Sequence, residues 1–176
     1  MALYRFENHT PQVDESAYVA ESALVIGNVR IGKDAYIGHG VILRGDYGAI
    51  EIGEGAAIEE GVIVHARPAD KTEIGSHVIV GHGAMIHNAV IKDDAVIGMR
   101  AMISDYSEVG SHSIIGEMSL VKNNQQIPDE VVAVGIPAKV IDKVDEHRRQ
   151  MWAWGKDLYV EMSRRYRAEG AFERID

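Results

Sequence analysis

Cysteine is absent from this sequence of 176 residues, which excludes disulfide bonds and thiolate metal ligands. Aromatic residues are scarce, at 6% of the chain, so aliphatic and small side chains have to form most of any core. No stretch approaches the roughly 18 consecutive apolar residues of a membrane-spanning helix, and the first residues contain no apolar segment typical of a secretory signal. We therefore expect a soluble, cytoplasmic protein without a membrane partner.

A basic surplus is absent as well. The chain has 18 lysine and arginine residues against 27 aspartate and glutamate residues, which gives a net charge of −9. Proteins that bind nucleic acids usually present a basic face to the phosphate backbone. The charge balance therefore argues against a nucleic-acid partner.

The sequence is rich in glycine and contains a six-residue repeat. An aliphatic residue recurs at every sixth position, with a shift of three residues after Leu43, a shift of four after Val64 and one shortened step after Ile86. Glycine often follows this residue, and alanine often stands two positions before the next one. The aliphatic positions are Val13, Val19, Val25, Ile31, Ile37, Leu43, Ile52, Ile58, Val64, Ile74, Val80, Ile86, Ile91, Ile97, Ile103, Val109, Ile115 and Val121.

This period fits neither a helix of 3.6 residues per turn nor an alternating strand. It indicates a solenoid in which each hexad forms one short strand and one corner, with three hexads per coil. We therefore predict an all-β solenoid, a left-handed parallel β-helix of hexapeptide repeats, over residues 1–139. A coincidental sandwich rich in Ile, Val and Gly would not hold this register over so many positions.

The remaining residues, 140–176, change to helical spacing. Their apolar stripe predicts a C-terminal α-helix that packs along the solenoid or on a neighbouring subunit. Gly155 weakens the middle of this helix. The predicted stripe consists of Val144, His147, Met151, Trp154, Leu158 and Met162.

The repeat also predicts which polar residues lie side by side. Positions three hexads apart stack on one face, about 4.8 Å from coil to coil. Arg44, His65 and His87 follow three stacked aliphatic residues and form one outward column. A second column on the preceding face consists of His39, Glu60 and His82.

These columns predict a metal site between subunits. His65 and His87 are close enough to hold one metal, whereas His82 lies on another face and can join them only from a neighbour related by a three-fold axis. The same symmetry brings Glu60 opposite Arg44. Three neutral imidazoles with one open position are typical of catalytic Zn²⁺. A histidine on its own is usually just a solvated side chain, and we interpret most of the other histidines in this way.

The same residues carry a family resemblance. The repeat, with Leu43-Arg44-Gly45-Asp46, then His65, then Gly81-His82-Gly83-Ala84-Met85-Ile86-His87, resembles the γ-class carbonic anhydrases. It looks especially like the bacterial branch with the carnitine-operon and phenylacetate-pathway proteins. The resemblance extends from about Tyr4 to the C-terminal helix.

The resemblance implies a homotrimer that hydrates carbon dioxide reversibly to bicarbonate, with Zn²⁺, or in some members Fe²⁺ or Co²⁺, bound by the three histidines. It implies an inter-subunit network of Arg44, Asp46 and Glu60. It also implies that Glu59 orients the reacting water. Tyr159 matches a tyrosine that reaches the active site in several relatives.

The chain departs from the family pattern in three ways. Glu59 and Ala57 stand where the family commonly has Gln and Asn. Tyr47 replaces a glutamate, and residues 66–71 replace a longer acidic loop, so the glutamates that export the proton are missing. We therefore expect proton transfer to buffer to be the slow step.

Three other functions stay open. Hydrolysis of acyl-CoA thioesters by the same metal site is one, and the phenylacetate-pathway relatives motivate it. Acyl transfer from CoA is a weaker one, because it rests on the fold alone. The third is a non-catalytic, metal-binding trimeric scaffold, which Glu59 and Ala57 favour.

Overall fold

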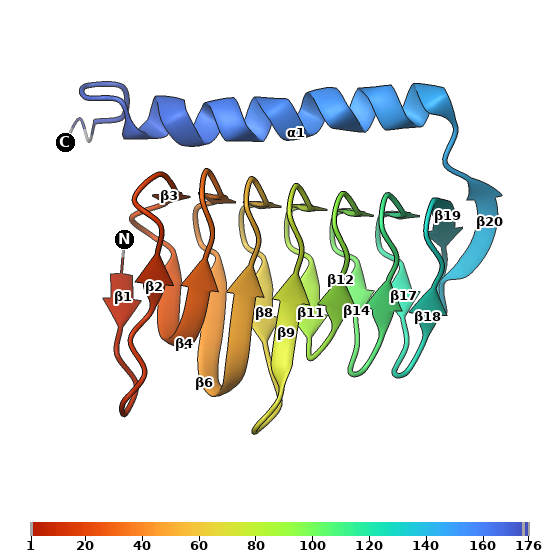
Figure 1. Ribbon diagram of the computed structural model, residues 1–176, viewed down its shortest axis with the longest axis horizontal. Helices are drawn as coiled ribbons and strands as arrows, with labels where there is room; N and C mark the ends of the chain where they lie inside the picture. The colour runs from red at the N-terminus through yellow and green to blue at the C-terminus, as the bar shows by residue number, and fades with distance from the viewer. Residues whose placement is uncertain (1, 174, 176) are drawn as a thin grey trace.

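The computed structural model describes residues 2–173 and 175, and it forms a left-handed parallel β-helix with one long C-terminal helix (Figure 1). Most strands contain only two or three residues, because each hexad has to leave room for its corner. The elements are β1 (Ala2–Tyr4), β2 (Gln12–Val13), β3 (Tyr18–Val19), β4 (Leu24–Ile31), β5 (Tyr36–Ile37), β6 (Ile42–Ile52), β7 (Ala57–Ile58), β8 (Ile63–His65), β9 (Lys71–Ile74), β10 (Ile79–Val80), β11 (Met85–His87), β12 (Val90–Ile91), β13 (Val96–Ile97), β14 (Met102–Ile103), β15 (Glu108–Val109), β16 (Ile114–Ile115), β17 (Leu120–Val121), β18 (Gln126–Ile127), β19 (Val131–Val134), β20 (Lys139–Lys143) and α1 (Glu146–Arg167).

The strands form the three faces of a prism. One face is the sheet β20-β19-β16-β13-β10-β7-β5-β3. The other two are joined into one sheet, because the long strands β4 and β6 run round the corner between them, so that β6 pairs with both β8 and β9. All pairs are parallel except β19 with β20, which is antiparallel and ends the solenoid.

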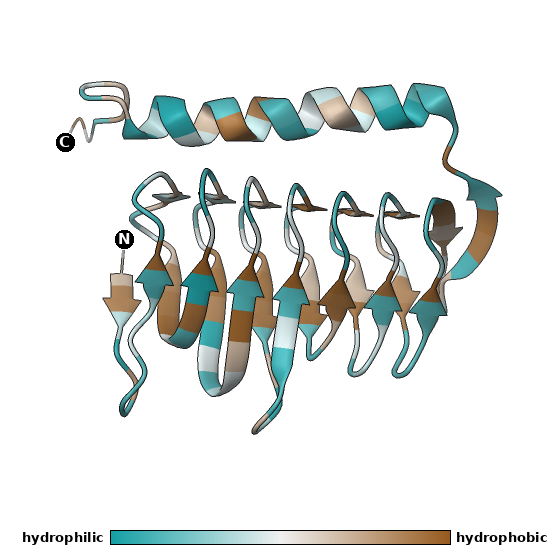
Figure 2. Cartoon of the chain, viewed as in Figure 1, coloured by the Kyte–Doolittle hydropathy of each residue, from teal (hydrophilic) through white to brown (hydrophobic). Residues whose placement is uncertain are grey.

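The core has the predicted register. Leu43 pairs with Val64, and Val64 pairs with Ile86, so the aliphatic residues of successive coils stack inside the prism. All three are fully buried. In Figure 2 the strands carry both brown and teal segments, because inward-facing apolar residues alternate with outward-facing polar ones. Val13, in the first coil, is only partly buried, because few residues cover that end of the stack.

The two register shifts form a pair of adjacent loops. The first lies within β6, and the second connects β8 with β9. They pack so closely that a Cβ on Gly48 would collide with the backbone carbonyl oxygens of Arg67 and Asp70. The loops therefore place residues around 46 and 67 on one corner of the prism.

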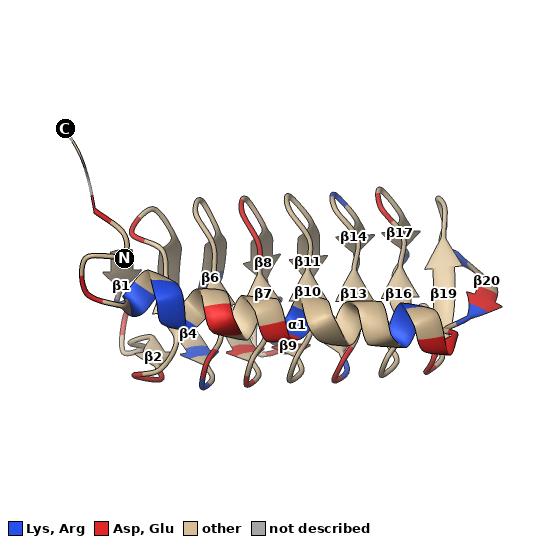
Figure 3. Ribbon diagram, turned by 90° about the horizontal axis from the view of Figure 1, so that it is seen from above, with Lys and Arg blue, Asp and Glu red and all other residues tan. Residues whose placement is uncertain are grey.

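Helix α1 runs back along the solenoid from β20 toward the N-terminal coils (Figures 1 and 3). Asp145 caps its first turn, with Oδ1 accepting a hydrogen bond from the backbone N–H of Arg148 at 2.7 Å. The helix continues through Gly155 without interruption. Among the described residues, no helix combines the length and the apolar composition that crossing a membrane requires.

The predicted apolar stripe of the helix is wrong in its central part. Met151, Trp154 and Leu158 are 47%, 68% and 41% exposed. The face of the helix that packs on the solenoid carries polar groups at the ends of its side chains. These groups hydrogen-bond to backbone carbonyl groups at the corners of the solenoid beneath. This packed face comprises Trp152, Lys156, Tyr159, Ser163 and Tyr166.

Two hydrogen bonds illustrate that packing. Lys156 Nζ donates to the carbonyl oxygen of Asp94 at 2.6 Å, and Ser163 Oγ donates to the carbonyl oxygen of Ala35 at 3.2 Å. A purely aliphatic stripe would leave the carbonyl oxygen of Asp94 without this partner, which is costly in a buried contact, whereas that of Ala35 also accepts the backbone N–H of Tyr18 at 2.9 Å. The polar contacts therefore decide which side of the helix faces inward.

Candidate metal centre

The column of Arg44, His65 and His87 is formed as the repeat predicts. Arg44 in β6 pairs with His65 in β8, and His65 pairs with His87 in β11. Each of these residues follows a buried aliphatic residue and therefore points outward from the prism. Three polar side chains from three successive coils thus lie side by side on one face.

The two imidazoles of this column face one another. His65 Nδ1 lies 3.1 Å from His87 Nε2. Two nitrogens that bind one tetrahedral Zn²⁺ at its usual bond length are about 3.3 Å apart. The His65 side chain is 12% exposed and that of His87 is 36% exposed. The donor pair therefore fits a metal that is approached from outside the chain.

A carboxylate lies behind each imidazole. Asp46 Oδ1 is 2.9 Å from His65 Nε2, and Asp105 Oδ1 hydrogen-bonds to His87 Nδ1. Burial by itself raises the pKa of Asp46, but hydrogen bonds from Arg44 and His65 outweigh it and lower that pKa. Both carboxylates are ionised acceptors, which is the usual outer shell of metal-binding histidines.

Asp105 and its partner Arg67 are absent from the residues that the sequence predicted for the site. Arg67 Nε donates to Asp105 Oδ2 at 2.9 Å, and this guanidinium is the main cause that lowers the pKa of Asp105. The repeat contained a signal for Asp105. Ile86 pairs with Ile103, so the column of His65 and His87 continues in the next coil at Ser104, and Asp105 directly follows Ser104.

His82 lies at the corner after β10 and is 49% exposed. Its Nε2 is 3.0 Å from Glu59 Oε2, and its Nδ1 is 2.8 Å from Glu60 Oε2. Glu59 is buried and also accepts the backbone N–H of His82, whereas Glu60 accepts the hydroxyl of Tyr36 at 2.9 Å. Two carboxylates from one coil thus hold the histidine of the next.

Tyr159 connects this cluster to α1. Its ring packs 5.3 Å from that of Tyr36. Burial, followed by hydrogen bonding to Glu59, raises the pKa of Tyr159 far above its ordinary value. Tyr159 therefore brings α1 next to Glu59, and its hydroxyl remains protonated.

The predicted site residues form two separate clusters within one chain. Arg44, whose Nη1 lies 2.7 Å from Asp46 Oδ2, belongs with His65 and His87. Over the part of the chain that the structure describes, no three His, Cys, Asp or Glu side chains come together as a metal site. A site that uses all three histidines therefore needs a second copy of the chain. The two clusters are Arg44, Asp46, His65 and His87, and Glu59, Glu60, His82 and Tyr159.

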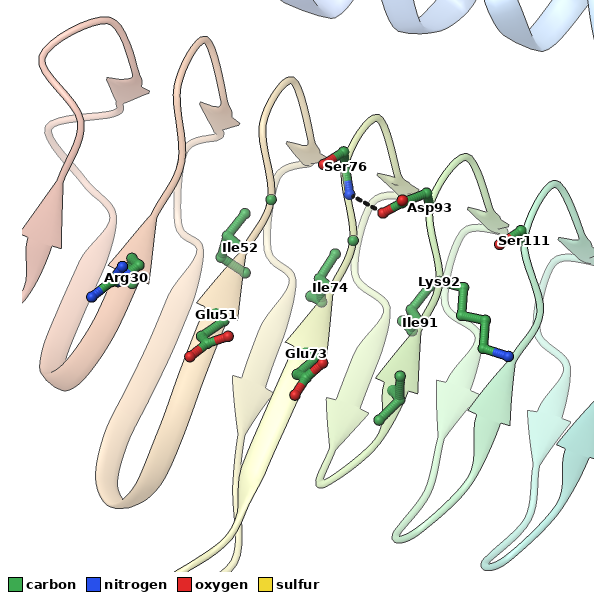
Figure 4. A pocket seen from close by; sticks show the side chains of 13 residues that line it. Arg30, Glu51, Ile52, Glu73, Ile74, Ser76, Ile91, Lys92, Asp93 and Ser111 are labelled. Atoms are coloured by element: carbon green, nitrogen blue, oxygen red, sulfur yellow. Dashed lines mark hydrogen bonds between the residues drawn. The ribbon is translucent and has the colours of Figure 1, made fainter.

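Pockets adjoin both clusters. A pocket of about 280 Å³ lies between α1 and the solenoid, next to Glu59 and His82, and is lined largely by apolar residues such as Ile79 and Trp152. A polar pocket of about 420 Å³ adjoins Asp46. The larger groove in Figure 4, of about 480 Å³, lies on another face and contains none of the predicted site residues.

Comparisons with known proteins agree in fold and differ in named activity. The chain is 36% identical over 175 residues to gamma carbonic anhydrase 2 of Arabidopsis thaliana mitochondria, covering 95% of this chain and 63% of that protein. It is 42% identical over 103 residues to the carnitine operon protein CaiE of Escherichia coli O157:H7, covering 58% of this chain and 53% of that protein. The chain thus spans between half and two thirds of the curated relatives it matches.

A crystal structure of a Bacillus cereus protein described as an acetyltransferase superposes with a TM-score of 0.92 at 31% identity, covering 94% of this chain and 96% of that one. No protein-family model matches the chain. Similarity to carbonic anhydrases and to an acetyltransferase leaves the choice of reaction to the site itself.

Proposed function

Because the chain belongs to the gamma carbonic anhydrase family of hexapeptide-repeat proteins, we propose that it is a metal-dependent lyase that reversibly hydrates carbon dioxide to bicarbonate. We further propose that it works as a homotrimer with active sites between subunits. The observation that supports this most strongly is the facing pair of His65 Nδ1 and His87 Nε2, 3.1 Å apart, with a carboxylate behind each ring.

The proposed metal is Zn²⁺, with Fe²⁺ and Co²⁺ as alternatives. His65 and His87 of one chain and His82 of its neighbour would hold it, which leaves one of four tetrahedral positions open. A bound ion of this kind supplies Lewis acidity, which makes water a nucleophile near neutral pH.

The surrounding side chains would orient the reactants. Glu59, buried beside His82, would accept a hydrogen bond from the reacting water. Arg44, paired with Asp46, would face Glu60 of the neighbouring chain and hold the interface in register. Tyr159, on α1 and next to Glu59, would act on the reaction through that carboxylate. Position 47 is a tyrosine and not a carboxylate, so transfer of the proton from the site to buffer would be slow.

Hydrolysis of acyl-CoA thioesters is a second candidate function. The pocket of about 280 Å³ beside His82 favours it, because carbon dioxide does not need an apolar pocket of this size whereas an acyl chain does. Filling the pocket distinguishes the two reactions. Val96 lines this pocket, so Val96→Phe should reduce thioester hydrolysis. The same substitution should leave carbon dioxide hydration unchanged, because carbon dioxide does not need the pocket.

Mixed trimers test the inter-subunit site. His82→Ala and His65→Ala chains each lack one half of every site, so trimers of a single variant should bind no metal. In trimers assembled at random from equal amounts of the two variants, a site is complete when a His82→Ala chain supplies His65 and His87 and the neighbouring His65→Ala chain supplies His82. This arrangement occurs at roughly a quarter of the sites, so roughly a quarter of the wild-type metal should return. A site built within one chain would stay empty in every mixture. His147→Ala, on the exposed side of α1, serves as the matched control.

Stopped-flow hydration of carbon dioxide on the same samples tests the reaction. Activity that rises in proportion to bound metal would support the carbonic anhydrase proposal. Metal-loaded trimers without hydration would overturn it. In that case thioester hydrolysis on the same protein, or its absence, decides between the second enzyme and a non-catalytic scaffold.

A further inference from the structure

We infer that Asp105, held in place by Arg67, is the positioning residue that orients His87 for metal binding. This inference rests on the proposed metal site, but it concerns contacts within one chain. Asp105 Oδ1 hydrogen-bonds to His87 Nδ1, and Asp105 Oδ2 accepts a hydrogen bond from Arg67 Nε at 2.9 Å. The Asp105 side chain is only 9% exposed, so it has little water to replace either partner.

The contact determines which nitrogen of His87 can bind a metal. An ionised carboxylate only accepts hydrogen bonds. Nδ1 of His87 therefore carries the proton, and the lone pair of its Nε2 points at His65. Asp46 imposes the corresponding arrangement on His65, where Nε2 faces the carboxylate and Nδ1 faces His87. Two lone pairs 3.1 Å apart repel each other unless a cation or a proton lies between them, and Arg44 Nη2, 3.4 Å from His65 Nδ1, offsets part of this repulsion in the metal-free chain.

Arg67 is itself held in place by a separate set of hydrogen bonds. Its backbone N–H donates to Asn88 Oδ1 at 2.9 Å, and Asn88 Nδ2 donates to Asp70 Oδ2 at 2.8 Å. Asn88 is buried and directly follows His87 in the chain. The loop between β8 and β9 is thereby fixed beside the histidine whose orientation it supports.

The experiment compares Asp105→Ala and Asp105→Asn with wild type and with Asp93→Ala. Asp93 is the matched control, because its Oδ1 accepts the backbone N–H of Ser76 at 2.7 Å in a similar turn, and its carboxylate has no imidazole partner among the described residues. Two readouts are taken on the purified full-length protein. One is Zn²⁺ affinity by chelator competition, and the other is the tautomer of His87 in metal-free protein by ¹⁵N NMR.

We expect Asp105→Ala to weaken Zn²⁺ binding by about 10- to 100-fold and to lower the population of the Nδ1–H tautomer. Asp105→Asn keeps an acceptor oxygen and should recover part of both effects. Asp93→Ala should change neither readout, although it removes a turn contact. Recovery by the amide separates positioning from a general loss of packing.

Unchanged affinity and unchanged tautomer in Asp105→Ala would overturn the inference. If that variant does not fold, the same result in Asp105→Asn would overturn it. Wild-type protein that binds Zn²⁺ but does not hydrate carbon dioxide would count against the proposed reaction alone. Wild-type protein that takes up no Zn²⁺ at His87 would overturn both.

Discussion

Glu59 faces His82 through a single oxygen: Oε2 accepts the backbone N–H of His82 at 3.0 Å and lies 3.0 Å from its Nε2. Glu60 Oε2 lies 2.8 Å from the other ring nitrogen. One imidazole is therefore held between two carboxylates. One ring nitrogen has to leave its carboxylate before it can bind a metal held by a second chain, so Glu59 affects both the ligand and the charge at the site.

The charge of Glu59 predicts a shift in the pH dependence of catalysis. A negative group close to the reacting water disfavours its deprotonation and raises the pKa of that water. We expect Glu59→Gln to move the rise of carbon dioxide hydration to lower pH by about one unit, which corresponds to about 1.4 kcal/mol. Glu54→Gln, at an exposed position, should leave the profile in place. A profile that stays fixed in Glu59→Gln would contradict the proposed role of this carboxylate.

Removing the hydroxyl of Tyr159 should destabilise the protein while keeping its packing. In Tyr159→Phe the ring still packs against Tyr36, but Glu59 loses a partner, which should cost about 1 kcal/mol of unfolding free energy. Denaturant unfolding at a fixed protein concentration measures the loss. Tyr106→Phe, with its exposed ring, is the control and should not change stability. Equal stability of the two variants would refute the hydrogen bond to Glu59.

The contact of Arg67 with Asp105 predicts a stability difference that depends on pH. The pKa of Asp105 is lower in the folded protein, so the contact stabilises the fold above the ordinary aspartate pKa of 3.8, and this stabilisation is lost as the pH falls through the lower, folded value. We expect Arg67→Ala to lower the free energy of unfolding modestly at pH 7, because the half-exposed guanidinium is screened by solvent. The difference from wild type should shrink below pH 4.

Unfolding of wild type, Arg67→Ala and Arg165→Ala between pH 7 and pH 3 measures this effect. Arg165 lies exposed in the last turn of α1 and has no carboxylate partner among the ion pairs of the described residues. Its removal should give a small difference from wild type. If the cost of Arg67→Ala were the same at pH 3 and at pH 7, the ionised Asp105 would not be its partner.

Gly155 offers a stabilising substitution. The glycine lies in the middle of α1, and a Cβ there would meet Ile79 and Trp152 no closer than 3.7 Å, which is ordinary contact. Gly155→Ala should therefore add about 0.5 to 1 kcal/mol of stability through helix propensity. Gly48→Ala is the opposite case, because its Cβ would collide with two carbonyl oxygens. Thermal unfolding should show opposite signs, and a destabilising Gly155→Ala would mean that α1 packs more closely than described.

The six-residue period determined the solenoid and its register. Because each stacked position recurs after a whole coil, the spacing alone brings His65 beside His87 and Glu60 beside His82. Pairing of this kind depends only on backbone geometry, and both pairs are present in the fold. The predicted packed stripe of α1 was wrong, since helical spacing alone does not indicate which polar groups on the solenoid need partners.

Tertiary structure decided the contacts made by side chains outside the repeat. Asp105 and Arg67 are 38 residues apart, and they meet because the loop between β8 and β9 folds over the corner beside His87. Tyr159 reaches Glu59 only because α1 runs back along the prism. The period contains no information about either arrangement, because loop paths and helix docking depend on close packing and hydrogen bonding between distant segments.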